Sequence, residues 1–443
     1  MDFWIKAAQL LLSLAILITL HEFGHYIAAR AFKIRVEKFY LFFDPWFSLL
    51  KKKIGDTEWG IGWLPLGGYV KIAGMVDESM DKEQLAQAPK EDEFRSKPTW
   101  QRLIVMLGGV TVNVVLGIFI YILVVAAWGD SRLENNSLKY GLAVNKEIRE
   151  LNLGIEDGDK IIAVDGEPVE NVTLINMQVF LRGYRTLDVK KPNGEVKQVI
   201  LDEEFDDFMW ENDAVMAFSP RMHIVVDSVM QTRDAYTKGL QSGDSIVALN
   251  GTPTPFYHLF QEELAQQEGD SALVNVGLYR DGEYKELEIW TDKNKTIGFQ
   301  LSNPGYLKST EIDYSFGEAI SRGIEKAGWT MHDYTAQLPL IFTSKGAQSV
   351  GGFGAIGSLF PAAWDWQVFW LNTAFISFVL AIMNILPIPA LDGGHIVFLI
   401  YEMITGKEAP QKVLEYAQLV GFIIVLGLFL FANGNDVYRA FFD

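Results

Sequence analysis

Residues 3–25 read FWIKAAQLLLSLAILITLHEFGH, an apolar run that ends on two histidines and a glutamate. At about 1.5 Å of rise per residue, a helix over Phe3–Leu20 covers about 27 Å, close to the thickness of a bilayer core. The run therefore predicts a membrane-spanning helix with His21, Glu22 and His25 near its far end. Such side chains are costly to place in lipid, so we expect them to serve a function.

Three further apolar runs, Leu103–Trp128, Val368–Leu386 and Tyr416–Phe431, could also cross a bilayer. The chain has 443 residues, of which 49% are hydrophobic, and its mean hydropathy is +0.12. These values favour four membrane helices over one large soluble core. The first run lacks a positively charged leader, so we expect it to be retained and not cleaved as a signal peptide.

The charge of the chain excludes one class of partner and predicts which segments lie on the cytoplasmic side of the membrane. A net charge of -18 and a pI near 4.8 would repel a phosphate backbone, so no nucleic-acid partner is expected. Lys and Arg follow the first run closely, which predicts a cytoplasmic location for Ala31–Thr99. The acidic stretch Gly129–Asp365 is expected on the opposite face, which is periplasmic in a Gram-negative cell. The basic residues are Arg30, Lys33, Arg35, Lys38, Lys51, Lys52 and Lys53.

An internal repeat lies in the acidic stretch, where residues 154–166 align with residues 239–251 without a gap. Each copy reads as a Gly-Asp turn, a short strand and an Asp-Gly or Asn-Gly hairpin turn. The pattern resembles the signature of PDZ domains, and its spacing of about 85 residues predicts two tandem copies, 129–217 and 218–304. Such domains capture extended peptides by strand addition. The alternatives are a steric gate over the membrane site and a purely structural role.

Two segments after the repeats have more limited interpretations. Residues 316–342 mix apolar and charged side chains, which predicts an amphipathic helix on the membrane surface. Residues 352–357 satisfy G-x-G-x-x-G, but no strand clearly precedes them and a membrane run follows. A nucleotide site is therefore not expected there.

His21-Glu22-Phe23-Gly24-His25 is an H-E-x-x-H motif, in which a spacing of four places both imidazoles on one helix face to bind a metal. The chain has no cysteine, so a catalytic zinc would need a third ligand from His or a carboxylate. That ligand is expected in residues 384–395, NILPIPALDGGH, whose prolines and glycines must break a membrane helix around a site. We favour Asp392; His395 is the rival, because imidazole binds zinc equally well.

The two motifs together, H-E-x-x-H and N-x-x-P-x-P-x-L-D-G in the third run, resemble the site-2 protease family of intramembrane zinc metalloproteases. The tandem PDZ insertion between the second and third runs is similar to that of a bacterial branch of this family. Residues 63–71 resemble the family's membrane-reentrant β-hairpin, and Gly109–Asn113 its G-x-x-x-N motif. Val110 departs from the proline often found after the glycine.

The resemblance implies zinc bound by His21, His25 and Asp392, with Glu22 as the general base. It also implies substrate positioning by Asn384, and it leaves His395 a structural role. Gly67 and Gly68 could hold an unwound substrate strand, or they could serve only a structural hairpin. The implied substrates are single-span membrane proteins trimmed on the periplasmic side, including an anti-sigma factor and signal-peptide remnants. The implied location is the inner membrane, with the site near its cytoplasmic side.

The predicted fold is a polytopic α-helical membrane protein with four transmembrane helices, a membrane-associated β-hairpin and two tandem PDZ domains. Two other functions compete with proteolysis: a catalytically inactive PDZ scaffold, and a zinc transporter. A transporter would need ionisable residues throughout the spans, whereas here they cluster at one depth. The predicted segments are 1–36 (first helix), 37–98 (cytoplasmic-side region with the reentrant segment), 99–128 (second helix), 129–217 and 218–304 (PDZ domains), 305–365 (amphipathic helices), 366–393 (third helix) and 394–443 (fourth helix and C-terminus).

Overall fold

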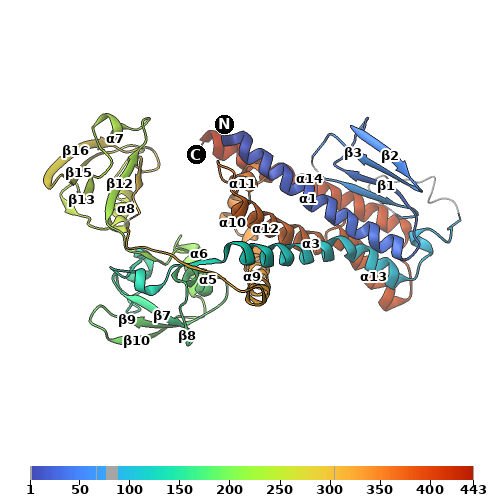
Figure 1. The fold of residues 1–443 in the computed structure, drawn as a ribbon, viewed down its shortest axis with the longest axis horizontal. Helices are drawn as coiled ribbons and strands as arrows, with labels where there is room; N and C mark the ends of the chain where they lie inside the picture. The colour runs from blue at the N-terminus through green and yellow to red at the C-terminus, as the bar shows by residue number, and fades with distance from the viewer. Residues whose placement is uncertain (1, 66, 76–87, 304, 443) are drawn as a thin grey trace. The chain divides into compact units, whose positions relative to one another are not determined.

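The computed structural model describes residues 2–65, 67–75, 88–303 and 305–442. The chain folds into two compact units, each described here by itself (Figure 1). The helical unit comprises Met1–Gly129 and Asp313–Asp443, and the β unit comprises Asp130–Ile312. The β unit is thus inserted into the sequence of the helical unit, between its second and third long apolar helices.

Four helices of the helical unit are long and apolar enough to cross a membrane, as the sequence predicts. The fourth is longer than its predicted apolar run, because polar turns extend the helix at both ends. These helices are α1 (Asp2–Ala31), α3 (Thr99–Trp128), α12 (Trp366–Ile385) and α14 (Gln411–Phe442).

Helix α3 packs directly against both α1 and α12. A Cβ on Gly24 of α1 would collide with the carbonyl oxygen of Gly108 in α3, so glycine is needed for this close approach. Further along α3, a Cβ on Gly117 would lie 2.7 Å from the ring of Phe378 in α12. Small residues at such contacts let membrane helices approach closely and gain van der Waals packing.

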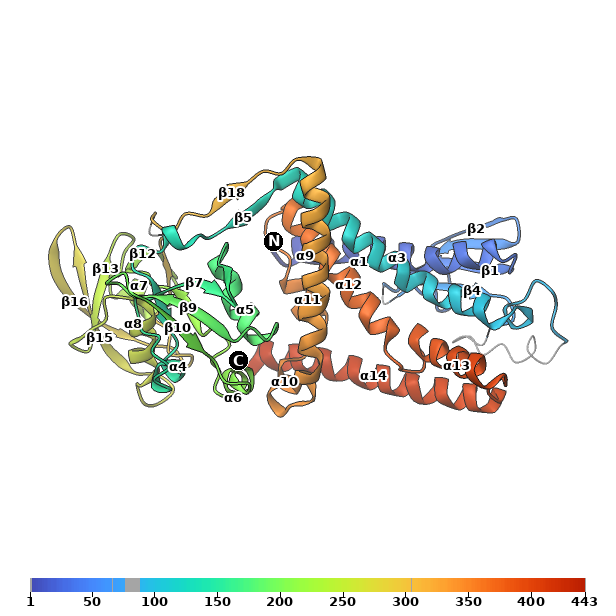
Figure 2. The same ribbon diagram turned by 90° about the horizontal axis from the view of Figure 1, so that it is seen from below.

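Helix α9 (Phe316–Gln337) lies across α3, and Gly323 packs against Ile122 there (Figure 2). It begins with a capping box formed by Ser315 and Glu318. The segment that follows contains η4 (Leu338–Phe342), α10 (Ser344–Ser349) and α11 (Phe353–Ser358). The glycine-rich start of α11 is tied to α14, because the backbone amides of Gly352, Gly354 and Ala355 donate to the Asp436 carboxylate.

A four-stranded sheet lies between α1 and α3 in the sequence, with the order β2-β3-β1-β4. The sequence predicts a hairpin over residues 63–71, but the hairpin is β2–β3, and residues 69–72 form the edge strand β4. Pro65 and two glycines break the predicted segment, so its second half pairs with β1 instead. The strands are β1 (Val36–Leu41), β2 (Leu50–Ile54), β3 (Thr57–Ile61) and β4 (Tyr69–Ile72), and η1 (Phe94–Ser96) follows.

A short helix that the sequence analysis did not separate, α13 (Asp392–Thr405), lies between α12 and α14. The connection before it is tightly folded: a Cβ on Gly393 would collide with the Leu386 carbonyl, and one on Gly394 would lie 2.6 Å from Pro389. Ala390 adopts a left-handed backbone with φ +79°. The turn thus starts a new helix at Asp392.

The β unit contains two domains of similar construction, each with its own hydrophobic core. In the first, four strands have the order β10-β9-β7-β8, and β6 pairs with β11. Its elements are η2 (Asn135–Ser137), β6 (Leu142–Val144), α4 (Lys146–Glu150), β7 (Lys160–Val164), β8 (Glu167–Pro168), η3 (Val172–Leu174), α5 (Ile175–Phe180), β9 (Thr186–Lys190), β10 (Val196–Ile200), α6 (Phe205–Glu211) and β11 (Phe218–Pro220).

The second domain has the strand order β16-β15-β13-β12-β17, with β14 paired to β13. The ends of the whole β unit are joined by β5 (Asp130–Arg132), which pairs antiparallel with β18 (Thr310–Ile312). The elements of the second domain are β12 (Ile224–Val229), α7 (Asp234–Thr237), β13 (Ser245–Leu249), β14 (Thr252–Pro253), α8 (Tyr257–Ala265), β15 (Leu273–Arg280), β16 (Glu283–Trp290) and β17 (Phe299–Leu301).

The repeated sequence forms equivalent turns in both domains. Asp165 and Asn250 have φ of 48° and 49°, as the predicted Asp-Gly and Asn-Gly hairpin turns require. The aspartates of the two Gly-Asp turns, Asp159 and Asp244, are both 1% exposed. Each is neutralised by a cation from a neighbouring strand or its end, Lys191 in the first domain and Arg280 in the second. The two copies of the repeat are therefore alike in structure as well as in sequence.

Candidate metal centre

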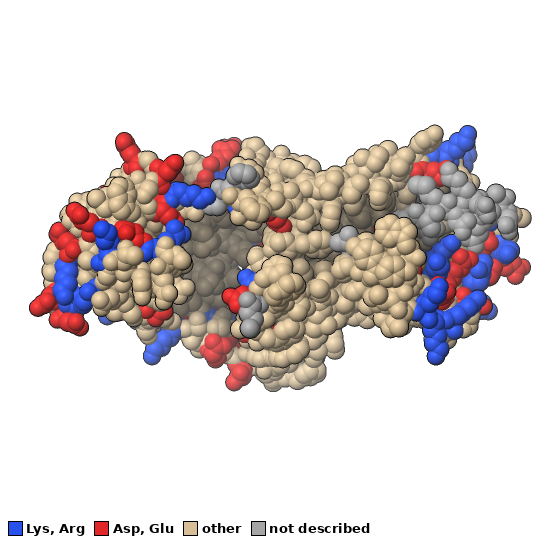
Figure 3. Space-filling model, turned by 90° about the horizontal axis from the view of Figure 1, so that it is seen from above, with Lys and Arg blue, Asp and Glu red and all other residues tan. Residues whose placement is uncertain are grey.

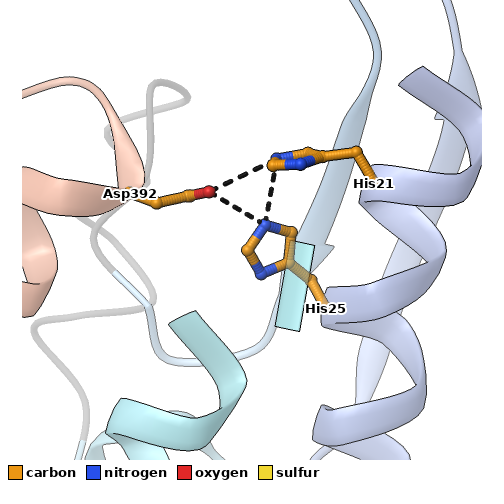
Figure 4. Close-up of side chains that lie close together, drawn as sticks. All are labelled: His21, His25 and Asp392. Carbon is orange, nitrogen blue, oxygen red and sulfur yellow. Dashed lines mark hydrogen bonds and ion pairs between the residues drawn. The ribbon is translucent and has the colours of Figure 1, made fainter. Parts of the chain in front are cut away.

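Helix α1 presents His21 and His25 on one face, and the first turn of α13 presents Asp392 opposite them (Figure 4). The Asp392 Oδ2 atom lies 3.3 Å from Nε2 of each histidine. The two Nε2 atoms are also 3.3 Å apart. Three potential metal ligands, far apart in the sequence, thus form an equilateral triangle.

The size of this triangle fits zinc. Two ligand atoms that each lie 2.0–2.1 Å from zinc in tetrahedral geometry are about 3.3–3.4 Å apart. The Asp392 Oδ2 atom is buried and accepts no hydrogen bond from any residue that the structure describes. A buried carboxylate oxygen in that condition needs a cation to offset its lost solvation. The site can therefore hold one zinc ion with three protein ligands and leave a fourth position for water.

Groups on α3 orient both imidazoles. The Val105 carbonyl lies 2.8 Å from Nδ1 of His25, and the Asn113 amide lies 3.2 Å from Nδ1 of His21. A histidine that binds zinc through Nε2 carries its proton on Nδ1, so both Nδ1 atoms must donate. The Val105 carbonyl is the acceptor for His25. For His21 the required acceptor is Oδ1 of Asn113, which is buried without a partner when Nδ2 faces the ring.

Gly109 of α3 provides the space for the two rings. A Cβ at this position would lie 2.5 Å from Cε1 of His21 and would collide with Nε2 of His25. One helical turn later, Asn113 lies on the same side of α3. The G-x-x-x-N pattern thus combines a clearance for the ligands with a hydrogen-bonding group for one of them.

A cavity of about 350 Å³ opens beside the ligand triangle. Glu22 lines it together with Val70 of β4. A Cβ on Gly68 would lie 2.7 Å from Ile18 and 2.8 Å from the Tyr40 carbonyl, so glycine lets β4 lie against α1. The other lining residues are His21, His25, Phe43, Gly68, Tyr69, Lys71, Ile72, Met75, Met106, Ala390, Leu391, Asp392, His395 and Gln418.

The remaining predicted residues lie near the cavity in different positions. His395 lines it, with Nε2 3.3 Å from Nε2 of Gln418 in α14, and is not part of the ligand triangle. Asn384 is half-buried in the last turn of α12. Neither Asn384 nor Gly67 belongs to the described residues that line the cavity.

Sequence reasoning did not identify Val105, Gly109 and Asn113 as parts of the centre. Gly109 and Asn113 could be noted only as a motif, because their contacts depend on which face of α3 meets α1. Val105 acts through its backbone carbonyl and leaves no signal in the sequence. The Gly108-Gly109 pair was the available sign, since adjacent glycines inside an apolar helix indicate a close helix contact.

Comparison with known proteins places the chain among metallopeptidases. The sequence model of Peptidase family M50 matches residues 9–428. The regulator of sigma E protease of Haemophilus influenzae is 28% identical, with 99% of this chain and 100% of the relative aligned. A protein of Vibrio cholerae, provisionally named a zinc metalloprotease, is 28% identical over 97% of each chain. One of Campylobacter jejuni, named in the same way, is 27% identical over 97% of this chain and 92% of the relative.

The choice of third ligand can be tested by metal analysis. We expect about one zinc per purified chain, and Asp392→Asn should remove most of it because the amide is a weaker ligand. The matched substitution His395→Ala should leave most of the zinc in place. Zinc retained by Asp392→Asn but lost from His395→Ala would make His395 the third ligand.

The clearance at Gly109 predicts an unusual sensitivity to one methyl group. Gly109→Ala should displace the imidazoles and lower the zinc content, although alanine is intrinsically better than glycine in a helix by about 1 kcal/mol. Gly427→Ala is the matched control, since a Cβ there meets nothing within 4 Å. Equal zinc content in the two variants would contradict the close packing of α3 against the ligands.

Proposed function

This chain belongs to peptidase family M50 and is a zinc metalloprotease, and we propose that it hydrolyses peptide bonds inside the membrane-spanning segments of single-span proteins. The observation that carries this proposal is the position of the ligand triangle: two of its residues lie on α1, one of the four helices suited to crossing a membrane. Ionisable residues on such a helix are costly unless they serve a function there, so the site is suited to substrates within the bilayer.

Glu22 is the proposed general base and acid. Bound zinc would polarise the scissile carbonyl and lower the pKa of the attacking water. Glu22 follows His21 directly and lines the same cavity, so its carboxylate can take a proton from that water. It then gives the proton to the leaving amine, and the two products separate as a free carboxylate and a free amine. No covalent bond to the enzyme is needed.

A helical substrate must unwind before attack, because its carbonyls are hydrogen-bonded within the helix. We propose that the unwound stretch adds as a strand beside β4, which is an edge strand of its sheet and lines the cavity. The segment around Gly67 and Gly68 would hold that stretch through its backbone. Asn384 would bind its backbone from the end of α12. A purely structural role for the two glycines remains the competing hypothesis.

The proposed orientation places the ligand triangle near the cytoplasmic face of the inner membrane and the β unit in the periplasm. It is supported by the cluster of Lys and Arg that follows α1, since such residues favour the cytoplasmic side. A relative acts in sigma E regulation according to its name. We therefore propose an anti-sigma factor as one substrate, and trimmed signal peptides as others.

The rival function, a catalytically inactive scaffold, would not need a complete metal centre. Here the three ligands and Glu22 line one cavity, and the Val105 carbonyl and the Asn113 amide lie beside the two imidazoles. Each of these polar groups is costly to bury in a membrane helix unless it is used. Their convergence favours an active enzyme.

The role of Glu22 can be separated from metal binding. Glu22→Gln should keep nearly normal zinc content, because Glu22 is outside the ligand triangle, and should lower cleavage by at least 100-fold, since proton transfer is lost. The assay is cleavage of a tagged single-span substrate in detergent, with zinc measured on the same samples. Substantial turnover by this variant would remove Glu22 from the mechanism.

We further propose that the two domains of the β unit are PDZ domains that limit access to the metal centre by size. A gate needs only bulk and position, and the chain enters and leaves the β unit through one point. The strands β5 and β18 pair there, so that Arg132 lies opposite Thr310. A bulky folded ectodomain would be excluded, and a trimmed substrate would pass.

Peptide capture is the second candidate role. The two domains differ in whether the backbone of their edge strand is free to pair with a peptide. In the first domain, the Asn176 side chain of α5 bonds to both the N–H and the carbonyl of Phe218 in β11, at 2.9 Å and 2.8 Å. These are the backbone groups that an added strand would use. Strand addition at Phe218 is thus already blocked by the protein's own side chain.

The second domain is open at the corresponding place. Gln261 of α8, 85 residues after Asn176, donates to the Tyr257 hydroxyl at 3.0 Å instead of to a strand. Strand β17 lies at the edge of its sheet, and no side chain in the described part of the chain bonds to the backbone of Phe299. If either domain captures a peptide, the second is the better candidate.

Replacement of Asp130–Ile312 by a short linker distinguishes the two roles. The paired strands β5 and β18 bring the ends of the β unit together, so the helical unit can be joined with little strain. Gating predicts faster cleavage of substrates with an intact ectodomain and unchanged cleavage of trimmed ones. Loss of trimmed-substrate cleavage in a deletion that still binds zinc would contradict gating and favour capture.

A further inference from the structure

The loop between β1 and β2 carries an exposed aromatic cluster. Trp46 is 90% exposed, and its ring stacks near that of Trp63, 6.2 Å between centroids. Phe47 stacks on the same Trp63 ring at 5.9 Å. The indole N–H of Trp63 donates to the Pro45 carbonyl at 3.0 Å, which fixes the cluster to the loop.

The backbone holds Trp46 outward at a cost. Its φ of 71° lies in the left-handed region, which is unfavourable for a bulky residue. Leu49 and Leu50 continue the exposed apolar surface and are 57% and 67% exposed. A strained residue that displays a large apolar side chain points to a surface that is covered in use.

Three consecutive lysines follow this apolar tip directly. Lys51, Lys52 and Lys53 form the centre of β2, the edge strand opposite β4, and all three are exposed. No carboxylate in the described part of the chain forms an ion pair with any of them. Figure 3 shows basic side chains, with acidic ones among them, at the sheet end of the helical unit, beside a largely uncharged surface. In a chain of net charge -18, this cluster is a local exception.

We propose that the 45–53 segment binds anionic phospholipid, with its aromatic tip among the acyl chains and its lysines at the phosphate headgroups. The order of the residues supports this ligand. The apolar tip with tryptophan and leucine would reach the acyl chains, and the lysines that follow it would lie at the level of the headgroups. The unpaired positive charges select anionic over zwitterionic lipid. The segment would thereby anchor the outer edge of the sheet whose other edge, β4, lines the metal cavity.

The absence of cysteine allows a single-site test in the full chain. Leu49→Cys is labelled with a fluorophore, and the protein is reconstituted into vesicles that contain either brominated phosphatidylcholine or brominated phosphatidylglycerol. Both lipids should quench the label, and the anionic one should do so with a preference on the order of tenfold at equal lipid fraction. Quenching by neither lipid, or equally by both, would overturn the proposal.

Charge variants of the labelled Leu49→Cys protein test whether the three lysines cause the preference for anionic lipid. Replacing Lys51, Lys52 and Lys53 by glutamine should abolish it while quenching by phosphatidylcholine persists, and replacing them by arginine should retain it. The matched control replaces Lys190, Lys197 and Lys238, three exposed lysines of the β unit, by glutamine and should leave the preference unchanged. Zinc content checks the fold of each variant. If the label were shielded from quenching only after an acidic single-span protein is added, the segment would instead bind a protein partner.

Discussion

The contact between α1 and α3 at their glycines is the constraint on which the metal centre depends. Gly24 and Gly108 allow the two backbones to touch, and Gly109 leaves just enough room for the imidazoles of His21 and His25. At this separation the Val105 carbonyl and the Asn113 amide reach the Nδ1 atoms. If larger side chains held α1 and α3 further apart, the Val105 carbonyl and the Asn113 amide would no longer reach the imidazoles. The small residues at this contact are therefore needed for the metal ligands as well as for packing.

The second requirement is a carboxylate at the depth of the two histidines, and a continuous α12 could not provide it. Residues 386–391 break the helix, and α13 restarts at Asp392, whose position in a helical first turn favours its negative charge. The break exposes backbone groups that lipid could not satisfy. Gly393 and Gly394 fold it back onto itself, and Gly421 of α14 packs against the Pro389 carbonyl, so α14 covers part of the turn.

Sequence patterns were informative where they follow local geometry and silent where contacts join distant segments. The four apolar helices follow from run length, and the spacing of His21 and His25 from the helical repeat. The pairing of β4 with β1, which replaced the predicted hairpin, depends on a partner about 30 residues away. His258 of α8 lies 3.0 Å from Asp157, about 100 residues earlier in the other domain. No periodicity reports such pairs.

The two domains of the β unit share one sequence signature but have different strand edges. Their turns match in backbone angles and in buried aspartates, because those features fix each fold. The strand edges differ, because edge chemistry is set by single side chains outside the signature. One asparagine closes β11, whereas the corresponding glutamine turns away from β17. The two copies therefore share a scaffold and differ at their strand edges, so a binding role must be argued separately for each copy.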